Sequence, residues 1–488
     1  MPPTALWCRH FRVPGKRYRG VTLGACWHDG DVRHFDLCII GTGSGNSIID
    51  ERFDRLNVAL VELGTFGGTC LNVGCIPSKM FVYPADLAAS SIQATKLGVD
   101  LHVREVRWRE IQERIFGRID PKAANGRTHR QQSHNVTVFD GRARFVGPRK
   151  LEVGAPETIT ADRVVIAAGS RPVVPDLPGL SSVEFHTSDT VMRVPKLPQS
   201  MIIIGGGYIA AEFAHVFSAF GTSVTVLNRS DVLLGREDSE VAKRFTELLG
   251  RRADVRLNTG VTSVEKTAEG RVRVHVKGPQ DLPEHLDAEV LLIATGRASN
   301  GDTLDPERGG IDVDDDGLIV VDPYQRTTAE SVFALGDVCS RQQLKHIANS
   351  DARVVQHNLL HPDSMITNDR RFVPRAVFSM PQVASVGLTE AEAAEHGIDF
   401  IVSKQDYGDT AYGWAMEDTD HFVKVIADAQ TKLLLGAHVI GPQASALIQP
   451  LIHAMSFQQS APEVVRGQYW IHPAITEVIE NVLLGVGD

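Results

Sequence analysis

Two short apolar segments that run directly into glycine-rich turns place the strongest constraint on the fold. One segment ends at Ile40 and leads into the turn Gly41–Asn46, and the other ends at Ile204 and leads into Gly205–Gly207. A helical interval and a second apolar segment follow each turn. A buried strand, a tight glycine turn, a helix and a parallel strand form the unit that binds nucleotides. The repeat therefore predicts an α/β fold with two nucleotide sites.

Length and charge exclude other classes of protein. The chain has 488 residues, which predicts about three domains at roughly 150 residues each. Its formal net charge of -10 has the wrong sign for neutralising a nucleic-acid backbone, so no nucleic-acid partner is expected. Residues 201–220 have the length of a membrane span, but Glu212 and the glycines among them favour a strand, a turn and a helix. No membrane partner is therefore expected.

The first glycine turn has the features of a dinucleotide site, with one departure. Gly41 permits the tight turn, and Gly43 lets backbone N–H groups approach a pyrophosphate at the N-terminus of a helix. Asn46 stands at the third position, where glycine or alanine is usual. Glu62 ends the second apolar segment, where a carboxylate binds ribose hydroxyls. The alternative for Glu62 is an ordinary surface residue at a strand end.

The second glycine turn predicts a preference for NADPH. Gly205, Gly207 and Ala210 match the dinucleotide pattern. The second apolar segment, which ends at residue 227, is not followed by an acidic residue that would bind the 2'-hydroxyl of NADH. Arg229 and Arg236 stand there instead and offer two guanidinium groups to the 2'-phosphate of NADPH. The alternative is that both arginines are solvated charges of an exposed loop.

A cysteine pair predicts redox chemistry. Cys70 and Cys75 lie five residues apart, so in a regular helix their Cα atoms would be too distant for a comfortable disulfide. Gly74 and Pro77 supply an irregular turn, and a helix N-terminus with Lys79 nearby would lower the pKa of a thiol. The alternatives are two buried structural cysteines or half of a metal site. No second pair completes four ligands, so no metal is expected.

The segment His472–Glu477 offers a base that an acid can orient. An imidazole titrates near neutral pH, and the carboxylate five residues later can hold the ring. Taken alone, such a pair is more often a structural histidine whose hydrogen bonds are satisfied within the fold.

Together these segments resemble the FAD-dependent pyridine nucleotide disulfide oxidoreductases, which include glutathione reductase, trypanothione reductase, dihydrolipoamide dehydrogenase and mercuric reductase. The most specific match is Gly67–Lys79, which resembles the family's redox disulfide beside the flavin. The resemblance covers about residues 34–488 and is supported by residues 294–297 and 334–337. A mercuric reductase would carry a further cysteine pair at its C-terminus, whereas the last cysteine here is Cys339.

The resemblance implies an α/β chain with two Rossmann-like nucleotide-binding domains, for FAD and NADPH, and an α+β C-terminal dimerisation domain. It also implies a homodimer whose active site is shared between the subunits. The predicted boundaries are 1–33 for a disordered N-terminal extension, 34–170 and 298–370 for the two parts of the FAD-binding domain, 171–297 for the NADPH-binding domain and 371–488 for the dimerisation domain.

The resemblance also assigns the residues that contact FAD or NADPH. They are Gly41, Gly43, Ser44, Asn46, Glu62, Gly68, Thr69, Lys79, Gly169, Asp337, Gly205, Gly207, Tyr208, Ala210, Arg229, Arg236 and Gly296. Residues 345–348 differ from the Thr-Pro-containing segment that is usual near the flavin.

In the mechanism that the resemblance implies, hydride passes from NADPH to FAD. Tyr208 resembles the gate that swings aside for the nicotinamide. Lys79 and Glu212 match the buried ion pair beside the flavin, where the fixed cation stabilises the reduced, anionic ring. The alternative for Glu212 is a carboxylate on a helix surface.

The cysteines and the histidine would then complete the reaction. The reduced flavin opens the disulfide through Cys75, and Cys70 attacks a small-molecule disulfide. The His472 imidazolium of the other subunit, held by Glu477, protonates the thiol that leaves. We expect a cytoplasmic enzyme, because thiol recycling fed by NADPH belongs there and the sequence has no visible export signal.

Three segments resemble one subgroup within this family: Asn46 with its neighbours, residues 412–418 and residues 466–470. The nearest alternative is another low-molecular-weight disulfide reductase, or a dihydrolipoamide dehydrogenase, on the same scaffold. A nucleotide-sensing or metal-binding protein without turnover is the alternative from another class.

Overall fold

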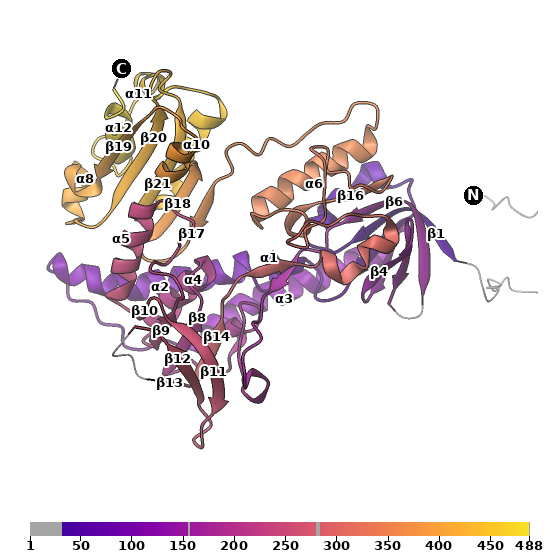
Figure 1. The fold of residues 1–488 in the computed structure, drawn as a ribbon, viewed down its shortest axis with the longest axis horizontal. Coiled ribbons are helices and arrows are strands. Elements are labelled where there is room, and N and C mark those ends of the chain that lie inside the picture. The colour runs from indigo at the N-terminus through magenta and orange to yellow at the C-terminus, as the bar shows by residue number, and fades with distance from the viewer. Residues whose placement is uncertain (1–31, 155–156, 280–283, 488) are drawn as a thin grey trace, which may run out of the picture.

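The computed structural model describes residues 32–487 apart from 155–156 and 280–283. Of the predicted N-terminal extension, residues 1–31 lie outside the described residues. Sheets of seven, four and five strands dominate the fold. Two long helices, α2 (Cys75–Lys96) and α3 (Trp108–Gln132), run across the middle of the molecule between these sheets, as Figure 1 shows.

The first sheet grows from the apolar segment before the first glycine turn. Its central strand β1 (Arg33–Ile40) is buried from Leu37 onward, because a parallel strand in mid-sheet is covered on both faces. β1 pairs in parallel with β2 (Val58–Glu62) and β6 (Thr158–Ile166). The strand order of the whole sheet is β3-β2-β1-β6-β5-β4, and β16 also pairs with β6. The remaining strands are β3 (Val136–Asp140), β4 (Ala143–Gly147), β5 (Lys150–Val153) and β16 (Val332–Ala334).

The prediction of a regular helix after the first glycine turn is wrong. Between residues 41 and 58, all of which are described, the chain forms only two short 3-10 helices, η1 (Gly45–Ile48) and η2 (Glu51–Phe53). The backbone is extended at Ile49 and Asp50, which ends η1. The Asp50 side chain accepts a hydrogen bond from Arg52 N–H and caps the N-terminus of η2. The Ile49 carbonyl accepts a hydrogen bond from a distant guanidinium instead of from a helical N–H. A long helix therefore cannot form here.

The second glycine turn leads into a regular helix. Strand β8 (Ser200–Ile204) is followed by α4 (Tyr208–Ala219) and β9 (Ser223–Leu227), which confirms the strand, turn and helix predicted for residues 201–220. The parallel order is β10-β9-β8-β14, with β10 (Asp254–Arg256) and β14 (Val290–Ile293). Beside it lie an antiparallel sheet of β11 (Gly260–Lys266), β12 (Val272–Lys277) and β13 (His285–Ala288), helix α5 (Ser239–Gly250), and the pair β7 (Ser170–Pro172) and β15 (Arg297–Ser299).

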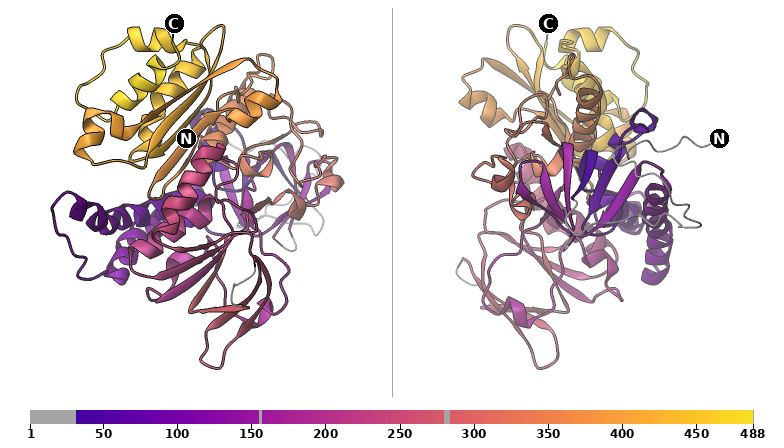
Figure 2. Two further views of the ribbon diagram at one scale, coloured as in Figure 1. Left: turned by 60° about the vertical axis from the view of Figure 1, so that its left-hand side comes forward. Right: turned by 90° about the vertical axis from the view of Figure 1, so that its right-hand side faces the viewer.

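The C-terminal part is an antiparallel sheet covered by helices, and it stays at one end of the molecule in both views of Figure 2. Its strand order is β17-β18-β21-β20-β19. The strands are β17 (Arg375–Val377), β18 (Gln382–Gly387), β19 (Phe400–Asp406), β20 (Phe422–Asp428) and β21 (Leu434–Gly441). The helices are α7 (Glu390–Glu395), α8 (Ala411–Ala415), α9 (Ala444–Leu447), α10 (Gln449–Ser456), α11 (Ala461–Arg466) and α12 (Glu477–Leu484).

The predicted fold class is confirmed. Two α/β units, the first with a mixed sheet and the second with a parallel one, and an α+β C-terminal unit are present, and helix α6 (Lys345–Leu360) returns the chain to the first unit. Over the described ranges, each helix is too short or too polar to traverse a bilayer. The domain boundaries given above stay a prediction.

Candidate active site

The two cysteines lie on either side of a break between two helices. Cys70 is in α1 (Gly68–Asn72), and Cys75 is the first residue of α2. Val73 and Gly74 leave the helical conformation, with ψ of 9° and -121°, which confirms the predicted irregular turn. Both thiols are free, and they share a hydrogen bond. The turn thus brings two sulfurs together that a continuous helix would separate.

The two thiols have opposite electrostatic characters. The hydrogen bond from Cys70 lowers the pKa of Cys75 to about 6, and the charge of Lys79 adds to this effect against partial desolvation. The same hydrogen bond, together with burial, raises the pKa of Cys70, while the charges of Lys345 and Lys79 act in the opposite direction. The expected stabilisation of a thiolate is therefore found at Cys75, and Cys70 is the sulfur that carries the proton.

Asn72 fixes the loop before the cysteines. Its side-chain amide donates to the carbonyls of Phe66 and Gly68, each at 3.0 Å, and Asn72 is buried. This anchor holds the glycine pair in front of Cys70. Asn72 lies inside the cysteine motif, but no general pattern assigned it this function.

Lys79 and Glu212 form the predicted ion pair. Lys79 Nζ lies 2.6 Å and 2.7 Å from the two carboxylate oxygens of Glu212, across the interface of α2 and α4. Glu212 is 5% exposed and also accepts from Phe378 N–H at 3.0 Å. The Lys79 ammonium lies 4.7 Å from the centre of the Phe378 ring. Phe378 was not predicted, because its contact with α4 depends on how the C-terminal sheet docks.

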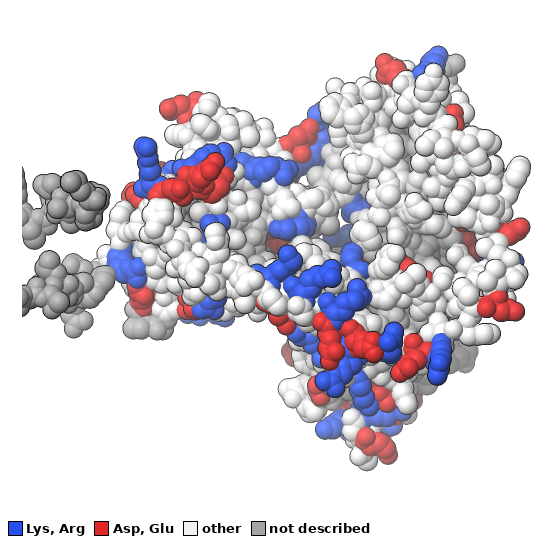
Figure 3. All heavy atoms as spheres, turned by 180° about the vertical axis from the view of Figure 1, so that it is seen from behind, with Lys and Arg blue, Asp and Glu red and all other residues white. Residues whose placement is uncertain are grey.

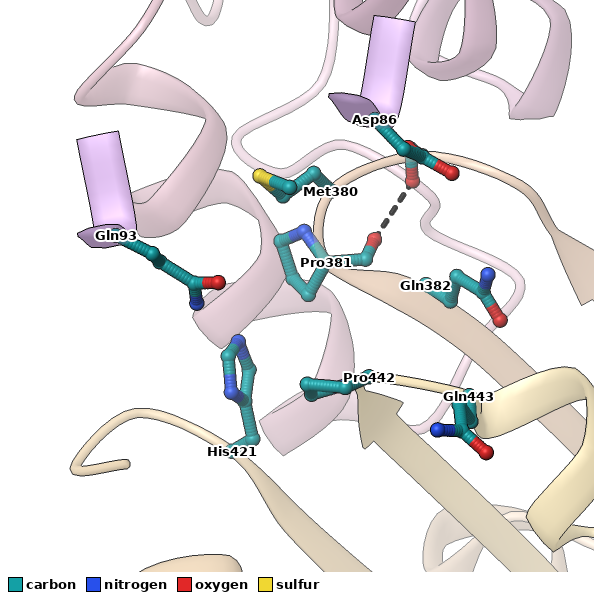
Figure 4. A pocket seen from close by; sticks show the side chains of 9 residues that line it. Asp86, Gln93, Met380, Pro381, Gln382, His421, Pro442 and Gln443 are labelled. Carbon is teal, nitrogen blue, oxygen red and sulfur yellow. Dashed lines mark hydrogen bonds between the residues drawn. The ribbon is translucent and has the colours of Figure 1, made fainter. Parts of the chain in front are cut away.

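A second polar contact joins the same two helices. His215 is fully buried, and its Nδ1 accepts from Arg252 at 2.9 Å, so its Nε2 carries the proton and donates to Asp86 at 2.7 Å. Asp86 also lines a cavity of about 210 Å³ between α2 and the C-terminal sheet, where Gln93 and His421 face it (Figure 4). None of the predicted site residues lines this cavity. These contacts keep α2 in place without adding to the redox centre.

The first glycine turn is held by side chains of its neighbours. Glu62, which ends β2, accepts from the N–H and the hydroxyl of Thr42 and from Gly64 N–H at 2.9 Å. Asn46 Oδ1 accepts from Arg130 Nε at 2.7 Å. The backbones of Gly43 and Gly68 approach so closely that a Cβ on Gly68 would lie 2.7 Å from Gly43 Cα. Glu62 thus braces the turn, its contact with a ribose stays a prediction, and Asn46 has a contact that sequence reasoning missed.

Ser44 and Lys345 connect this turn to the start of α6. Lys345 Nζ donates to Ser44 Oγ at 2.7 Å, and Ser44 is buried. The segment 345–348, which departs from the family pattern, therefore reaches the predicted flavin site through its lysine.

Asp337 and Tyr208 are two further residues predicted to contact the cofactors. Asp337 accepts from Ser170 Oγ at 2.8 Å. Partial burial raises the pKa of Tyr208 to about 12, against the opposing charge of Arg297. Tyr208 is nevertheless 45% exposed, so its ring borders open space at the start of α4. Tyr208 is four residues before Glu212 in α4, so it lies one helical turn from the Lys79–Glu212 pair.

The second glycine turn is open to ligands. A Cβ on Gly207 would meet no atom within 4 Å, whereas Gly206 is packed against the Asn228 side chain. Arg229 and Arg236 are exposed, and within the described residues neither guanidinium has an ion-pair partner. Of the other predicted contacts, Ala210 is in the first turn of α4, and Gly68 and Thr69 open α1. Gly169 and Gly296 lie in the loops that follow β6 and β14.

His472 and Glu477 form their predicted pair in the C-terminal unit. His472 Nδ1 lies 2.6 Å from Glu477 Oε1, the imidazole is 71% exposed and the carboxylate side chain is 15% exposed. Helix α12, which begins at Glu477, lies apart from α1 in Figure 1. Within one chain the structure therefore does not bring His472 to the cysteines.

Positive side chains gather on one face despite the overall negative charge. Figure 3 shows Lys and Arg around the hollow where the two lobes of the molecule meet. A local positive field of this kind attracts anionic ligands such as nucleotides.

Comparisons with known proteins agree with this geometry. Residues 35–352 match the family model described as pyridine nucleotide-disulphide oxidoreductase, and residues 373–483 match the dimerisation domain of that family. The chain is 52% identical over 462 residues to mycothione reductase of Mycobacterium tuberculosis (strain CDC 1551 / Oshkosh), with 93% of this chain and 99% of the relative covered. It is 32% identical over 473 residues to dihydrolipoyl dehydrogenase of Mycobacterium leprae (strain TN), with 93% and 98% covered.

Solved structures give the same picture. The HOCl-induced flavoprotein disulfide reductase RclA from Escherichia coli is similar with a TM-score of 0.80 and 29% sequence identity, over 92% of this chain and 99% of that chain.

Proposed function

This chain belongs to the pyridine nucleotide-disulphide oxidoreductases, and from that premise we propose that it uses NADPH to reduce mycothione, the disulfide of mycothiol. The main observation in favour of a disulfide reductase is the contact of the Cys70 and Cys75 thiols at the start of α2. Identity of 52% to a mycothione reductase, against 32% to a dihydrolipoyl dehydrogenase, favours mycothione as the substrate. Asn46 and residues 412–418 and 466–470 resemble the mycothione reductase subgroup and support the same choice.

The residues of the first glycine turn fit FAD. A Cβ on Gly68 would lie 2.7 Å from Gly43 Cα, so only glycine at Gly68 lets the two backbones meet. The backbone N–H groups of this turn would then bind the pyrophosphate. Glu62 would hold the ribose, and Asp337 would hold the chain between the pyrophosphate and the flavin. The chemistry that bound FAD supplies is two-electron transfer between the nicotinamide and the cysteine pair.

The residues of the second glycine turn fit NADPH. The open space at Gly207 admits a pyrophosphate at the N-terminus of α4. Arg229 and Arg236 would bind the 2'-phosphate, because two exposed guanidinium groups without an ion-pair partner in the described chain are available to it. Tyr208, exposed at the start of the same helix, would move aside for the nicotinamide.

The two cysteines have different roles in the proposed reaction, according to their protonation. Cys75 is stabilised as a thiolate and lies beside the Lys79–Glu212 pair, so it faces the electron donor. Cys70 becomes the free thiol that attacks the substrate disulfide. One substrate sulfur then forms a mixed disulfide with Cys70, and the second leaves as a thiolate that takes up a proton.

A second copy of the chain would supply that proton. His472 is oriented by Glu477 but is exposed and remote from α1 of its own chain. Tyr469 and Ile471, which flank it, are 102% and 74% exposed, although large apolar side chains are usually covered. The dimerisation domain supports a homodimer, in which His472 would reach the Cys70 of the partner. We also propose that the enzyme works in the cytoplasm.

Oxidation of NADPH in the presence of mycothione, glutathione disulfide and lipoamide tests this function. We expect a yellow protein whose kcat/KM is highest for mycothione. Replacement of Cys70 by Ser should abolish turnover of the disulfide and leave reduction of the flavin by NADPH intact. A preference for lipoamide with NADH would instead identify a dihydrolipoamide dehydrogenase. A colourless protein would contradict the proposal of an FAD-dependent enzyme.

A further inference from the structure

The first glycine turn is in contact with a cation that no carboxylate of the described chain neutralises. Lys345 is the first residue of α6, and its Nζ donates to Ser44 Oγ at 2.7 Å. An ammonium has further N–H donors, and within the residues that the structure describes this is the one hydrogen bond that Lys345 Nζ makes. Lys345 takes part in no ion pair among them. Because Lys345 is half-buried, its charge has lost part of its hydration and is available to an anion.

Ser44 fixes the position of this ammonium. The residue is only 8% exposed and lies inside the turn itself. Its Oγ donates to Asn349 Oδ1 at 3.3 Å, one turn along α6 from Lys345, and its carbonyl accepts from Ser47 Oγ at 2.6 Å. These contacts hold the start of α6 against the glycine turn. The ammonium is therefore placed at the loop whose backbone N–H groups would bind the pyrophosphate of FAD.

The N-terminus of α6 adds to the positive charge at this place. The helix has 16 residues, and the side chain of its N-cap, Leu344, makes no hydrogen bond to the first turn. The dipole of such a helix favours an anion at this end. Glu62, the carboxylate that braces the turn, accepts instead from Thr42 and Gly64. An ammonium and a helix N-terminus thus meet at one hydroxyl, in the segment 345–348 that departs from the family pattern.

We propose that Lys345 is a binding residue for FAD, and that its ammonium contacts the pyrophosphate together with Ser44 Oγ. This inference rests on the proposed function, which makes FAD the resident cofactor. The backbone N–H groups of the turn satisfy pyrophosphate oxygens but carry only partial charge. Lys345 supplies a full positive charge, and a hydrogen bond between two charged groups is roughly twice as strong as a neutral one.

The rate at which the holoenzyme releases FAD tests this contact. Ultrafiltration at timed intervals after dilution, with the absorbance of the free flavin, would give the rate. For Lys345→Met we expect release to be about 10- to 100-fold faster, because one charge-assisted hydrogen bond to the pyrophosphate is lost. Lys345→Arg keeps the charge and should release FAD at nearly the original rate. Arg353→Met, at an exposed position further along the same helix, removes a charge away from Ser44 and should change nothing.

Two further measurements separate a contact with the pyrophosphate from other roles of Lys345. Salt screens a charge pair, so the release of FAD should accelerate with ionic strength, and it should accelerate less in Lys345→Met. The midpoint potential of the bound FAD should be the same in both proteins, because the ribityl chain separates the pyrophosphate from the ring that takes up electrons. Neither measurement needs a disulfide substrate, so neither depends on whether mycothione is the substrate.

Three outcomes would overturn the proposal. Equal rates of release from the original protein and Lys345→Met would show that the ammonium does not bind FAD. Faster release with an unchanged salt dependence would mean that Lys345 only supports the packing of the turn. A changed midpoint potential with an unchanged rate would assign the ammonium to the flavin ring. If Lys345→Met does not fold, Lys345→Gln gives the same comparison with a polar side chain. An original protein without FAD would contradict the proposed function itself, so the two failures can be told apart.

Discussion

The two glycine turns begin alike but differ in what surrounds them. At the first turn, Glu62 accepts hydrogen bonds from Thr42 and Gly64, Arg130 donates to Asn46, and Lys345 donates to Ser44. At the second turn, a Cβ on Gly207 would meet nothing within 4 Å, and the nearby arginines are exposed. One turn is braced by side chains from distant segments, and the other is left open.

This difference matches two kinds of ligand. A cofactor that stays bound through many turnovers is best held by a rigid site whose groups are fixed beforehand. A nucleotide that must enter and leave in each turnover needs an accessible site, where affinity comes from charges at the rim. The first turn is therefore suited to FAD and the second to NADPH.

The largest expected effect comes from adding one methyl group to each turn. Gly41 has a φ of +100°, and a Cβ there would lie 2.3 Å from the Ala167 carbonyl oxygen. Gly205 has a φ of +128°, and its Cβ would lie 2.2 Å from the Ala294 oxygen. We expect Gly41→Ala to yield protein without FAD and with lower thermal stability. Gly205→Ala should keep FAD but slow its reduction by NADPH more than about 100-fold, since loss of two or more hydrogen bonds to the phosphates costs that much.

Visible absorbance per mole of protein and stopped-flow reduction would measure both effects. Gly117→Ala is the matched control, because a Cβ at that helical position meets no atom within 4 Å. If Gly205→Ala also lost its FAD, the two turns would not be independent sites.

The second effect concerns the choice of nucleotide. In the variant with both Arg229→Gln and Arg236→Gln, the 2'-phosphate of NADPH loses two charge-assisted hydrogen bonds, each worth about 1.5–3 kcal/mol. We expect the KM for NADPH to rise by about 100-fold or more and the KM for NADH to change less than about twofold. Steady-state kinetics with both nucleotides would check this. Equal increases in both KM values would mean that the arginines bind a part common to both nucleotides.

Local sequence patterns were enough to predict the strands that lead into the two glycine turns, because these strands depend on neighbouring residues. The predicted ends of two apolar segments, at Glu62 and at Ile204, are the observed ends of β2 and β8. Apolar runs and glycine turns are local, and both faces of a parallel strand are buried whatever packs on them. The Lys79–Glu212 pair was predicted only through the family resemblance.

The bracing of the first turn could not be predicted, because its partners are far away in the chain. Arg130 and Asn46 are 84 residues apart, and Lys345 and Ser44 are 301 residues apart. No periodicity or turn signal connects such residues, since their contact depends on how α3 and α6 pack. The same contacts explain why the expected helix after Gly41 is replaced by 3-10 turns. The Asn46 and Ile49 carbonyls accept from Arg130.

The C-terminal sheet holds the loop beside the open turn, which carries Arg229 and Arg236. Arg375 in β17 donates to Glu237 at 2.8 Å and to the Arg236 carbonyl at 2.9 Å. Ser385 in β18 donates to the other Glu237 oxygen at 2.6 Å. Glu237 is 6% exposed in its side chain, so this anchor is largely shielded from solvent. It fixes the end of the loop that carries both nucleotide arginines.

The smallest expected effect is loss of this anchor in Arg375→Gln. Arg375→Gln removes both hydrogen bonds of Arg375, but the change reaches the 2'-phosphate only through the position of Arg236. We therefore expect the KM for NADPH to rise by only about two- to tenfold. The KM for NADH and the kcat should stay the same, since NADH has no phosphate at that position. Arg371→Gln, which breaks an exposed pair with Asp369 and a contact with the Phe372 ring, is the control and should leave both KM values unchanged. A lower melting temperature with no difference between the nucleotides would mean that Arg375 supports the fold alone, and the open turn would then position its arginines without help from the C-terminal sheet.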